Sequence, residues 1–139
     1  MNLLPLVVAV LAASSTPRPD RVAECLRYEP DTVAITGVLV RKTFPGPPNY
    51  ESIQEGDEPE TGFYLEVSAG LCTVASPDSM NNDNGAFSDV RLVQLVLDAA
   101  GYSHLRPQLG RQVTLRGTLF AHFTGHHHAP LLLWVLRGS

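Results

Sequence analysis

The chain has 139 residues, of which 44% are hydrophobic and 17% are charged, and its formal net charge is −4. That length suits one domain with one hydrophobic core, and this composition excludes wholesale disorder. Ten Lys and Arg against fourteen Asp and Glu give no general attraction for phosphate, so nucleic acid is not an expected partner. No phosphate-binding glycine motif, zinc-protease motif or serine-hydrolase elbow is present.

The N-terminus predicts export. Residues 1–17 carry no charged side chain, and Leu3–Ala13 is almost wholly apolar. As a helix this run spans roughly 16 Å at about 1.5 Å per residue, too short for a bilayer core of about 30 Å. Small residues follow at positions 12–15, as a signal-peptidase site requires. We expect a signal peptide over residues 1–16, a periplasmic or secreted protein and no membrane span in the mature chain; a buried N-terminal helix is the alternative.

Two cysteines, Cys25 and Cys72, remain in the mature chain. Glu24 does not suit the small residue that a lipidation site needs before its cysteine, so lipidation of Cys25 is not expected. In an oxidising compartment an even count indicates a disulfide, worth roughly 4 kcal/mol for a loop of about 48 residues in the chain-entropy model. Two buried thiols or a metal pair are the alternatives, but no His lies near either cysteine at zinc-ligand spacing.

Five segments have the β-rich composition or the alternation of strands. They cover Asp31–Lys42, Thr61–Val67, Asp89–Leu97, Gln112–Ala121 and Ala129–Leu136, with extended character resuming over residues 71–75 after Gly70. Asp98–Leu109 is the one short helix candidate, because Asp98 or Ser103 can cap it and Gly110 suits a left-handed stop. Pro107 limits that helix to a turn or two.

The order β-β-β-α-β-β predicts an all-β fold with one short helix, an OB-fold-like five-stranded Greek-key barrel. Residues 33–39 and 113–119 share the pattern V-x-[I/L]-x-G-x-L, which places a glycine between inward apolar positions where a strand must coil sharply. We expect an N-terminal segment over residues 17–30, tied by the disulfide, and a single barrel domain over residues 31–137. An open β-sandwich is the alternative.

The segment Thr43–Glu60 is expected to be a long loop between the first two strands. It holds four prolines, and five acids fall within ten residues without a base: Glu51, Glu55, Asp57, Glu58 and Glu60. Its front half can pack on the barrel through Phe44, Tyr50 and Ile53, and its back half is expected to be solvated. The alternative is an exposed surface loop without a function.

The last hairpin contains four of the five histidines, over residues 121–130. A three-residue turn with Gly125 in the left-handed conformation would place His122 opposite His126, with His128 on the same side. These three imidazoles, His122, His126 and His128, are weak candidates for Zn²⁺ or Cu²⁺. A two-residue turn would instead pair His122 with His127, and a purely structural hairpin is also open.

In an OB-like barrel these two loops flank the same binding face. We therefore expect five side chains to line a surface for ligand or partner binding: Phe44, Tyr50, His122, Phe123 and His126.

Four stretches carry a resemblance to a known family. They are residues 25–30 (CLRYEP), 44–53 (FPGPPNYESI), 61–65 (TGFYL) and 124–130 (TGHHHAP). They resemble a bacterial family of domains of unknown function, number 4431, over about residues 25–136. The resemblance implies a small, exported protein and supplies no catalytic residues.

These observations favour an exported, non-enzymatic binding module for an unknown protein, glycan or small ligand of the cell envelope. The alternatives are an inhibitor or immunity protein against an envelope-targeted enzyme, and a histidine-based metal-binding protein. No cofactor is expected, and an enzyme is the least favoured class, because the acids cluster on one loop rather than in a pocket with a nucleophile or base.

Overall fold

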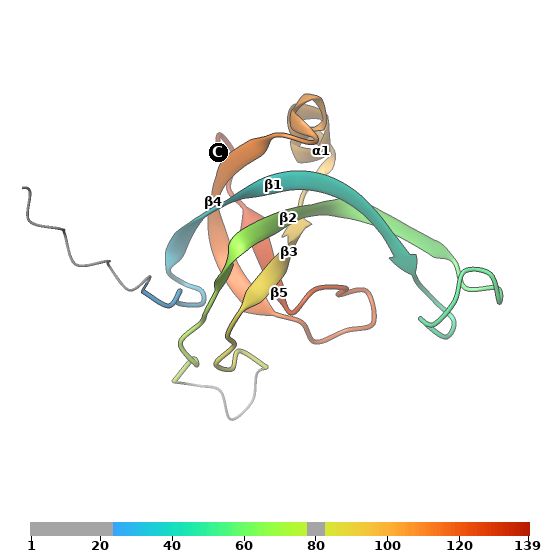
Figure 1. The fold of residues 1–139 in the computed structure, drawn as a ribbon, viewed down its shortest axis with the longest axis horizontal. Coiled ribbons are helices and arrows are strands. Elements are labelled where there is room, and N and C mark those ends of the chain that lie inside the picture. The colour runs from blue at the N-terminus through green and yellow to red at the C-terminus, as the bar shows by residue number, and fades with distance from the viewer. Residues whose placement is uncertain (1–23, 78–82) are drawn as a thin grey trace, which may run out of the picture.

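The computed structural model describes residues 24–77 and 83–139, so the expected signal peptide lies outside the described residues. The elements follow the predicted order (Figure 1). They are β1 (Thr32–Pro45), β2 (Pro59–Leu71), β3 (Val90–Val96), α1 (Ala99–Leu105), a 3₁₀ turn (Arg106–Gln108), β4 (Gln112–Ala121) and β5 (Leu131–Val135). The predicted all-β fold with one short helix is confirmed.

The five strands form a closed barrel in the order β1-β2-β3-β5-β4. All neighbouring strands are antiparallel except β3 and β5, which are parallel. Closure through the β1–β4 pair does not fit the alternative of an open sandwich. The ring order and the helix between β3 and β4 are those expected of an OB-like barrel, a likeness that rests on topology alone.

The two glycines of the repeated pattern lie inside β1 and β4, as predicted. Gly37 pairs with Val113, and Gly117 pairs with Val33 on one side and Val135 on the other. A Cβ atom on Gly37 would lie 2.7 Å from the carbonyl oxygen of Glu66, and one on Gly117 would overlap the carbonyl oxygen of Trp134. At both positions the backbone of the neighbouring strand lies too close for any side chain. The two glycines therefore let β1 and β4 coil tightly enough to close the ring.

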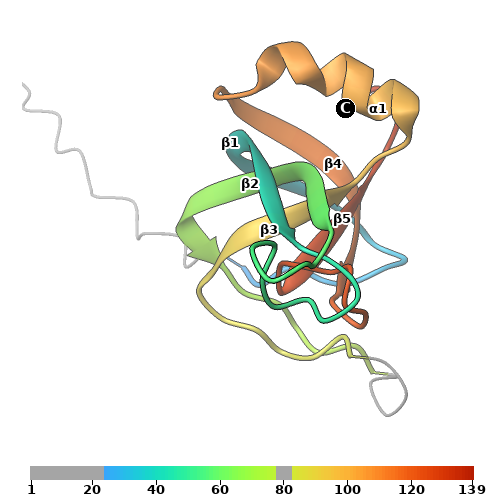
Figure 2. The same cartoon turned by 90° about the vertical axis from the view of Figure 1, so that its right-hand side faces the viewer.

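The core fills the inside of the ring. Alternate residues of the strands point inward and are almost fully buried: Ile35, Leu39, Leu65, Val93, Leu115, Leu119, Leu131 and Leu133. Leu105 of α1 is also buried, and α1 lies across one end of the barrel (Figure 2). Each such side chain contributes about 1.5–3 kcal/mol of hydrophobic stabilisation.

The helix boundaries follow from capping. The carboxylate of Asp98, and not the hydroxyl of Ser103, is the N-cap, and it accepts a hydrogen bond from the backbone N–H of Gly101 at 2.7 Å. Pro107 lies in the 3₁₀ turn that follows α1. Gly110 has a φ of 84°, the predicted left-handed stop.

The predicted disulfide is confirmed, because Cys25 and Cys72 are bonded. It ties residues 24–31 to the end of β2, where the backbone N–H of Leu26 donates to the carbonyl of Cys72. The hydroxyl of Tyr28 donates to the carbonyl of Gly85 at 2.6 Å. Among the described residues, no helix has the length and apolar character needed to cross a membrane.

Candidate functional site

The β1–β2 loop (46–58) and the β4–β5 loop (122–130) contact each other, as the predicted architecture requires (Figure 2). The ring of Tyr50 meets that of His126 edge-on, with centroids 5.5 Å apart, and the Tyr50 hydroxyl lies 3.3 Å from Nε2 of His126. A Cβ atom on Gly125 would lie 2.8 Å from the Tyr50 ring. The missing side chain at Gly125 therefore lets the two loops close on each other.

Glu60, at the start of β2, joins the two loops. Its Oε1 lies 2.5 Å from Nδ1 of His126, and its Oε2 lies 2.6 Å from Nε2 of His128. Because an ionised carboxylate only accepts hydrogen bonds, both imidazoles donate to it. The remaining Nε2 of a neutral His126 then accepts from the hydroxyl of Tyr50.

The carboxylate of Glu60 is held in its charged form. Burial opposes its ionisation, but the hydrogen bonds from His128 and His126 outweigh that effect and lower the pKa of Glu60 below its ordinary value. Phe44, which pairs with Glu60 across β1 and β2, stacks on the ring of His128 with centroids 5.0 Å apart. The carboxylate and the stacked ring fix His128 from two sides.

Gln94 of β3 fixes the backbone of the same loop. Its Oε1 accepts from the N–H of His128 at 2.7 Å, and its Nε2 donates to the carbonyl of His126 at 3.2 Å. One amide therefore satisfies both polar groups of this short segment, and the imidazoles are held in place before any ligand arrives.

These groups surround a cavity of about 300 Å³ on the outer face of β2 and β3. Its polar lining comes from Glu60, Thr61, Tyr64, Gln94, Tyr102, His126 and His128. Tyr64 is only 1% exposed. Burial, together with the neighbouring Tyr102 and Glu60, raises the pKa of Tyr64 to about 12. Its phenol therefore keeps its proton at neutral pH and is available as a hydrogen-bond donor.

The β1–β2 loop is ordered around Asp57, whereas the sequence predicted a solvated back half. Asp57 is 5% exposed, and its carboxylate accepts from the backbone N–H groups of Asn49, Glu51 and Ser52 at 2.8–2.9 Å. Within this loop Tyr50 has a φ of 59°, a left-handed conformation that a tyrosine rarely adopts. The Asp57 hydrogen bonds thus hold the residues on either side of a strained Tyr50, at the position where its ring meets His126.

We expect Asp57→Asn to loosen this loop and to lower the thermal midpoint at pH 7. Hydrogen bonds from the backbone of Ser52 and Glu51 lower the pKa of Asp57. Its stabilisation is therefore fully present above the unfolded pKa of about 3.9 and is lost as the pH falls through the lower folded pKa. The midpoint difference between wild type and Asp57→Asn should shrink over that interval in a pH series of thermal melts. The exposed Glu55→Gln is the control, and a difference that stays constant down to about pH 2 would contradict this role.

His122 and Phe123, two of the five predicted contact residues, lie away from the cavity. The N–H of His122 donates to the carbonyl of Pro130, and its ring faces Phe87 at 6.4 Å between centroids. Phe123 is 65% exposed and meets the ring of His127 edge-on. The structure thus brings together Phe44, Tyr50 and His126 and leaves the other two on a separate surface of the loop.

Both tight turns predicted for the last hairpin are wrong. β4 ends at Ala121 and β5 begins at Leu131, so His122 pairs with Pro130 rather than with His126 or His127. Gly125 does not adopt the left-handed conformation that the three-residue turn requires. The absence of its side chain instead allows the close approach of Tyr50. The expected set His122, His126 and His128 does not converge, and no three His, Cys, Asp or Glu side chains within residues 24–77 and 83–139 are placed to hold a metal ion.

Sequence reasoning missed seven of the nine residues that line the cavity, among them Glu60, Tyr64, Gln94 and Tyr102. In the sequence Glu60 stands out only as part of an acidic run, although the period of two places it on the same face of β2 as Tyr64. That alternation is a signal that could have found both residues. Nothing in the sequence points to Gln94 or Tyr102, because their role depends on how β3 and α1 lie against the loop.

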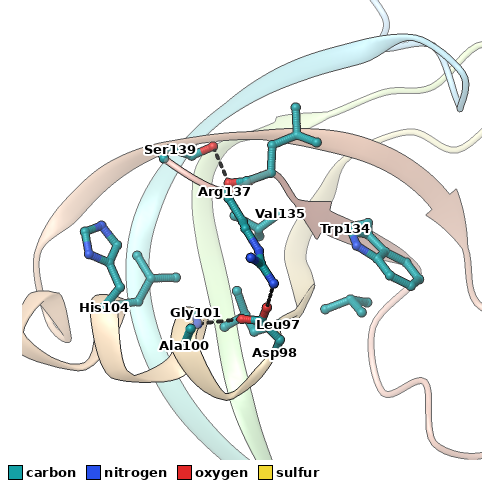
Figure 3. A pocket seen from close by; sticks show the side chains of 13 residues that line it. Leu97, Asp98, Ala100, Gly101, His104, Trp134, Val135, Arg137 and Ser139 are labelled. Carbon is teal, nitrogen blue, oxygen red and sulfur yellow. Dashed lines mark hydrogen bonds and ion pairs between the residues drawn. The ribbon is translucent and has the colours of Figure 1, made fainter.

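A second hollow of about 720 Å³ lies between α1 and β5 (Figure 3). Its apolar lining includes Val96, Leu97, Leu105, Trp134, Val135 and Leu136. The indole of Trp134 is 59% exposed at one side of it. Asp98, besides capping α1, forms an ion pair with Arg137 at 3.1 Å across the hollow. None of the predicted site residues lines it.

Residues 92–136 match the family model described as Domain of unknown function (DUF4431). No curated protein and no solved structure shows significant similarity to the chain. The match supports the family predicted from the sequence over a segment that begins in β3 and reaches the end of β5. This segment contains Gln94, Tyr102, His126 and His128 but neither Phe44 nor Glu60.

Proposed function

We propose that this protein, assigned to the DUF4431 family over residues 92–136, is an exported, non-enzymatic binding module. Its ligand is a small polar molecule, or the polar end of a larger one, that enters the cavity between the two loops. The observation that carries this proposal is Glu60, whose carboxylate binds both His126 and His128 and so fixes the wall of the cavity in advance. Preformed hollows with a few converging polar groups are the usual form of small-ligand sites.

Binding is favoured over catalysis by the pairing of these groups. The carboxylate of Glu60 already accepts from two imidazoles, and Gln94 is engaged at both ends by the backbone of the β4–β5 loop. Groups held in this way offer fixed hydrogen-bonding partners to a ligand. A reaction would instead need a nucleophile next to a base that is free to accept its proton.

Export is supported by the disulfide, since such bonds persist in oxidising compartments and are rare in the cytosol. Fractionation of the native host tests it. The mature chain should be found outside the cytoplasm and should begin between about residues 13 and 20, near the predicted signal-peptidase site. An intact chain in the cytoplasm would contradict export.

The binding proposal is tested by filling the cavity. A Cβ atom on Gly62 would lie 3.5 Å from the Tyr64 ring and 3.7 Å from the hydroxyl of Tyr102, which are ordinary contacts. Gly62→Val should therefore fold normally while its methyl groups occupy the hollow. Saturation-transfer NMR with a library of small polar fragments should find hits for the wild type that bind at least tenfold more weakly to Gly62→Val, or about 1.4 kcal/mol.

The matched control is Gln112→Val, which adds a valine to an exposed strand position on β4. It should bind the same fragments as the wild type. Hits that bind Gly62→Val as well as the wild type, or a library without any hit on the wild type, would contradict a ligand site in this cavity.

An inhibitor or immunity protein is the second candidate, and the exposed Phe123 favours it. A large aromatic side chain with 65% of its surface exposed is typical of the anchors that protein partners bury. Under this alternative, Phe123→Ala would abolish capture of an envelope enzyme and Gly62→Val would not. Loss of binding in Gly62→Val, with binding kept in Phe123→Ala, would instead support a ligand site in the cavity.

A further inference from the structure

We propose that the ligand of the cavity is a neutral oligosaccharide, with one sugar residue among the polar groups of the cavity and the next against the indole of Trp134. This inference rests on the proposed function and names the chemical class of its ligand. It is carried by the charge pairing inside the cavity and by the position of Trp134 on the neighbouring part of the same barrel face.

The cavity favours a ligand without charge. Its carboxylate, on Glu60, is paired with two imidazoles, so a cation would have to displace them. An anion would meet that carboxylate and the acids of the adjacent β1–β2 loop, and no Lys or Arg is among the described residues that line the cavity. A neutral ligand would neither have to displace the imidazoles nor be repelled by the carboxylates.

The hydrogen-bonding groups suit hydroxyls. The phenol of Tyr64 stays protonated, because burial and its neighbours raise its pKa to about 12, and Tyr102 supplies a second phenol. Beside them lie the carboxylate oxygens of Glu60, which have lone pairs left beyond their hydrogen bonds from the two imidazoles. Sugar hydroxyls both donate and accept, so one sugar ring can satisfy this mixed set, which an apolar molecule would leave without partners.

The hollow beside α1 continues the same face. Alternate residues of β3 point outward, so Gln94 in the cavity and Val96 in the hollow lie on one face, about 7 Å apart. Val96 pairs with Trp134 of β5, which places the indole in the row next to the floor of the cavity. Helix α1 borders both hollows, through Tyr102 on one side and Gly101 on the other.

Trp134 has the properties of a platform for a second sugar residue. Its indole is 59% exposed and stands on the opposite side of the hollow from His104 (Figure 3). The apolar C–H face of a sugar ring covers an aromatic face, and the indole N–H remains free to bond to a hydroxyl. The apolar lining around Trp134 would be covered in the same step.

Single-stranded nucleic acid also uses aromatic platforms on barrels of this type, but it needs a positively charged groove. The chain has a net charge of −4, and the loop at the cavity is its most acidic segment. The negative charge of the protein therefore favours a neutral oligosaccharide over single-stranded nucleic acid.

Trp134 is the only tryptophan of the chain, so its fluorescence reports occupancy of its own hollow. The full-length mature protein is titrated with N-acetylglucosamine, chitotriose, maltotriose and a short oligothymidine, each to about 10 mM, with calorimetry in parallel. We expect one of the trisaccharides to shift the emission and to bind at least tenfold more tightly than a single sugar. Trp134→Ala should remove that gain, Trp134→Phe should keep part of it, and Tyr64→Phe should weaken single sugars and trisaccharides alike.

The proposal is overturned if neither trisaccharide binds, if their binding is the same for Trp134→Ala, or if oligothymidine binds more tightly than both. This failure can be told apart from failure of the proposed function. If polar fragments still bind the wild type and not Gly62→Val while sugars do not bind, the cavity is a ligand site for another chemistry. If neither fragments nor sugars bind, both proposals fail.

Discussion

Gly117→Val is expected to destabilise the barrel more than valine at either Gly37 or Gly62. Gly117 lies where β4 is paired on both sides, with Val33 of β1 and Val135 of β5. An added Cβ atom would overlap the carbonyl oxygen of Trp134, a backbone atom that cannot rotate away. The loss of unfolding free energy should lie at or above the upper end of the roughly 1–3 kcal/mol typical of overpacking.

Gly37 and Gly62 provide an internal comparison for this result. At Gly37 the nearest backbone oxygen, of Glu66, would be 2.7 Å away, and at Gly62 the nearest atom would be 3.5 Å away in the Tyr64 side chain. Urea denaturation should therefore rank the losses as Gly117→Val, then Gly37→Val, then Gly62→Val. If Gly62→Val were the most harmful of the three, crowding by the backbone would not be the reason for these glycines.

Removing the disulfide is the second large effect. Cys25→Ser and Cys72→Ser should each lower the unfolding free energy by a similar amount, within the roughly 2–5 kcal/mol typical of small secreted domains. The bond closes a loop with a sequence separation of 47. It holds residues 24–31 beside residues 72–74, where the N–H of Leu26 donates to the carbonyl of Cys72 and that of Val74 donates to the carbonyl of Leu26. Without it, the segment is retained by these hydrogen bonds, by the hydrogen bond from the Glu29 N–H to the carbonyl of Leu119, and by the contacts of Leu26 and Tyr28 with the core.

The control is the wild type under reducing conditions, which should match the double variant Cys25→Ser/Cys72→Ser in its urea midpoint. Two free thiols in unreduced native protein, or a midpoint that reduction does not change, would contradict a stabilising bond. The single variants should not differ from the double variant by more than the effect of one partly buried thiol.

The strands and the helix could be predicted because local chemistry determines them. β4 has the predicted boundaries, since alternation runs without interruption from Gln112 to Ala121. β1 and β2 run further than predicted, to Pro45 and from Pro59, because pairing continues through two prolines at the ends of the hairpin. The sequence pattern gives no measure of where pairing between two strands stops.

The site could be predicted only in part. The approach of Tyr50 to His126 follows from placing two loops at one end of a barrel. The cavity itself depends on long-range contacts, such as Glu60 with His128 and Gln94 with the backbone of the β4–β5 loop. Residues so far apart in the sequence carry no local sign of each other, so the acidic run predicts only a solvated surface. The close approach of Gly125 to Tyr50 is another long-range contact that the local turn patterns do not predict.

The most direct test of the ligand site is a map of amide chemical shifts in the ¹⁵N-labelled protein, recorded with the polar fragments that bind it. If the cavity between the two loops holds the ligand, perturbations should concentrate at Glu60, Tyr64, Gln94, Tyr102 and residues 126–128. They should vanish in Gly62→Val. Perturbations confined to the surface around Phe123 and His122, with the cavity residues unchanged, would contradict a ligand site in the cavity.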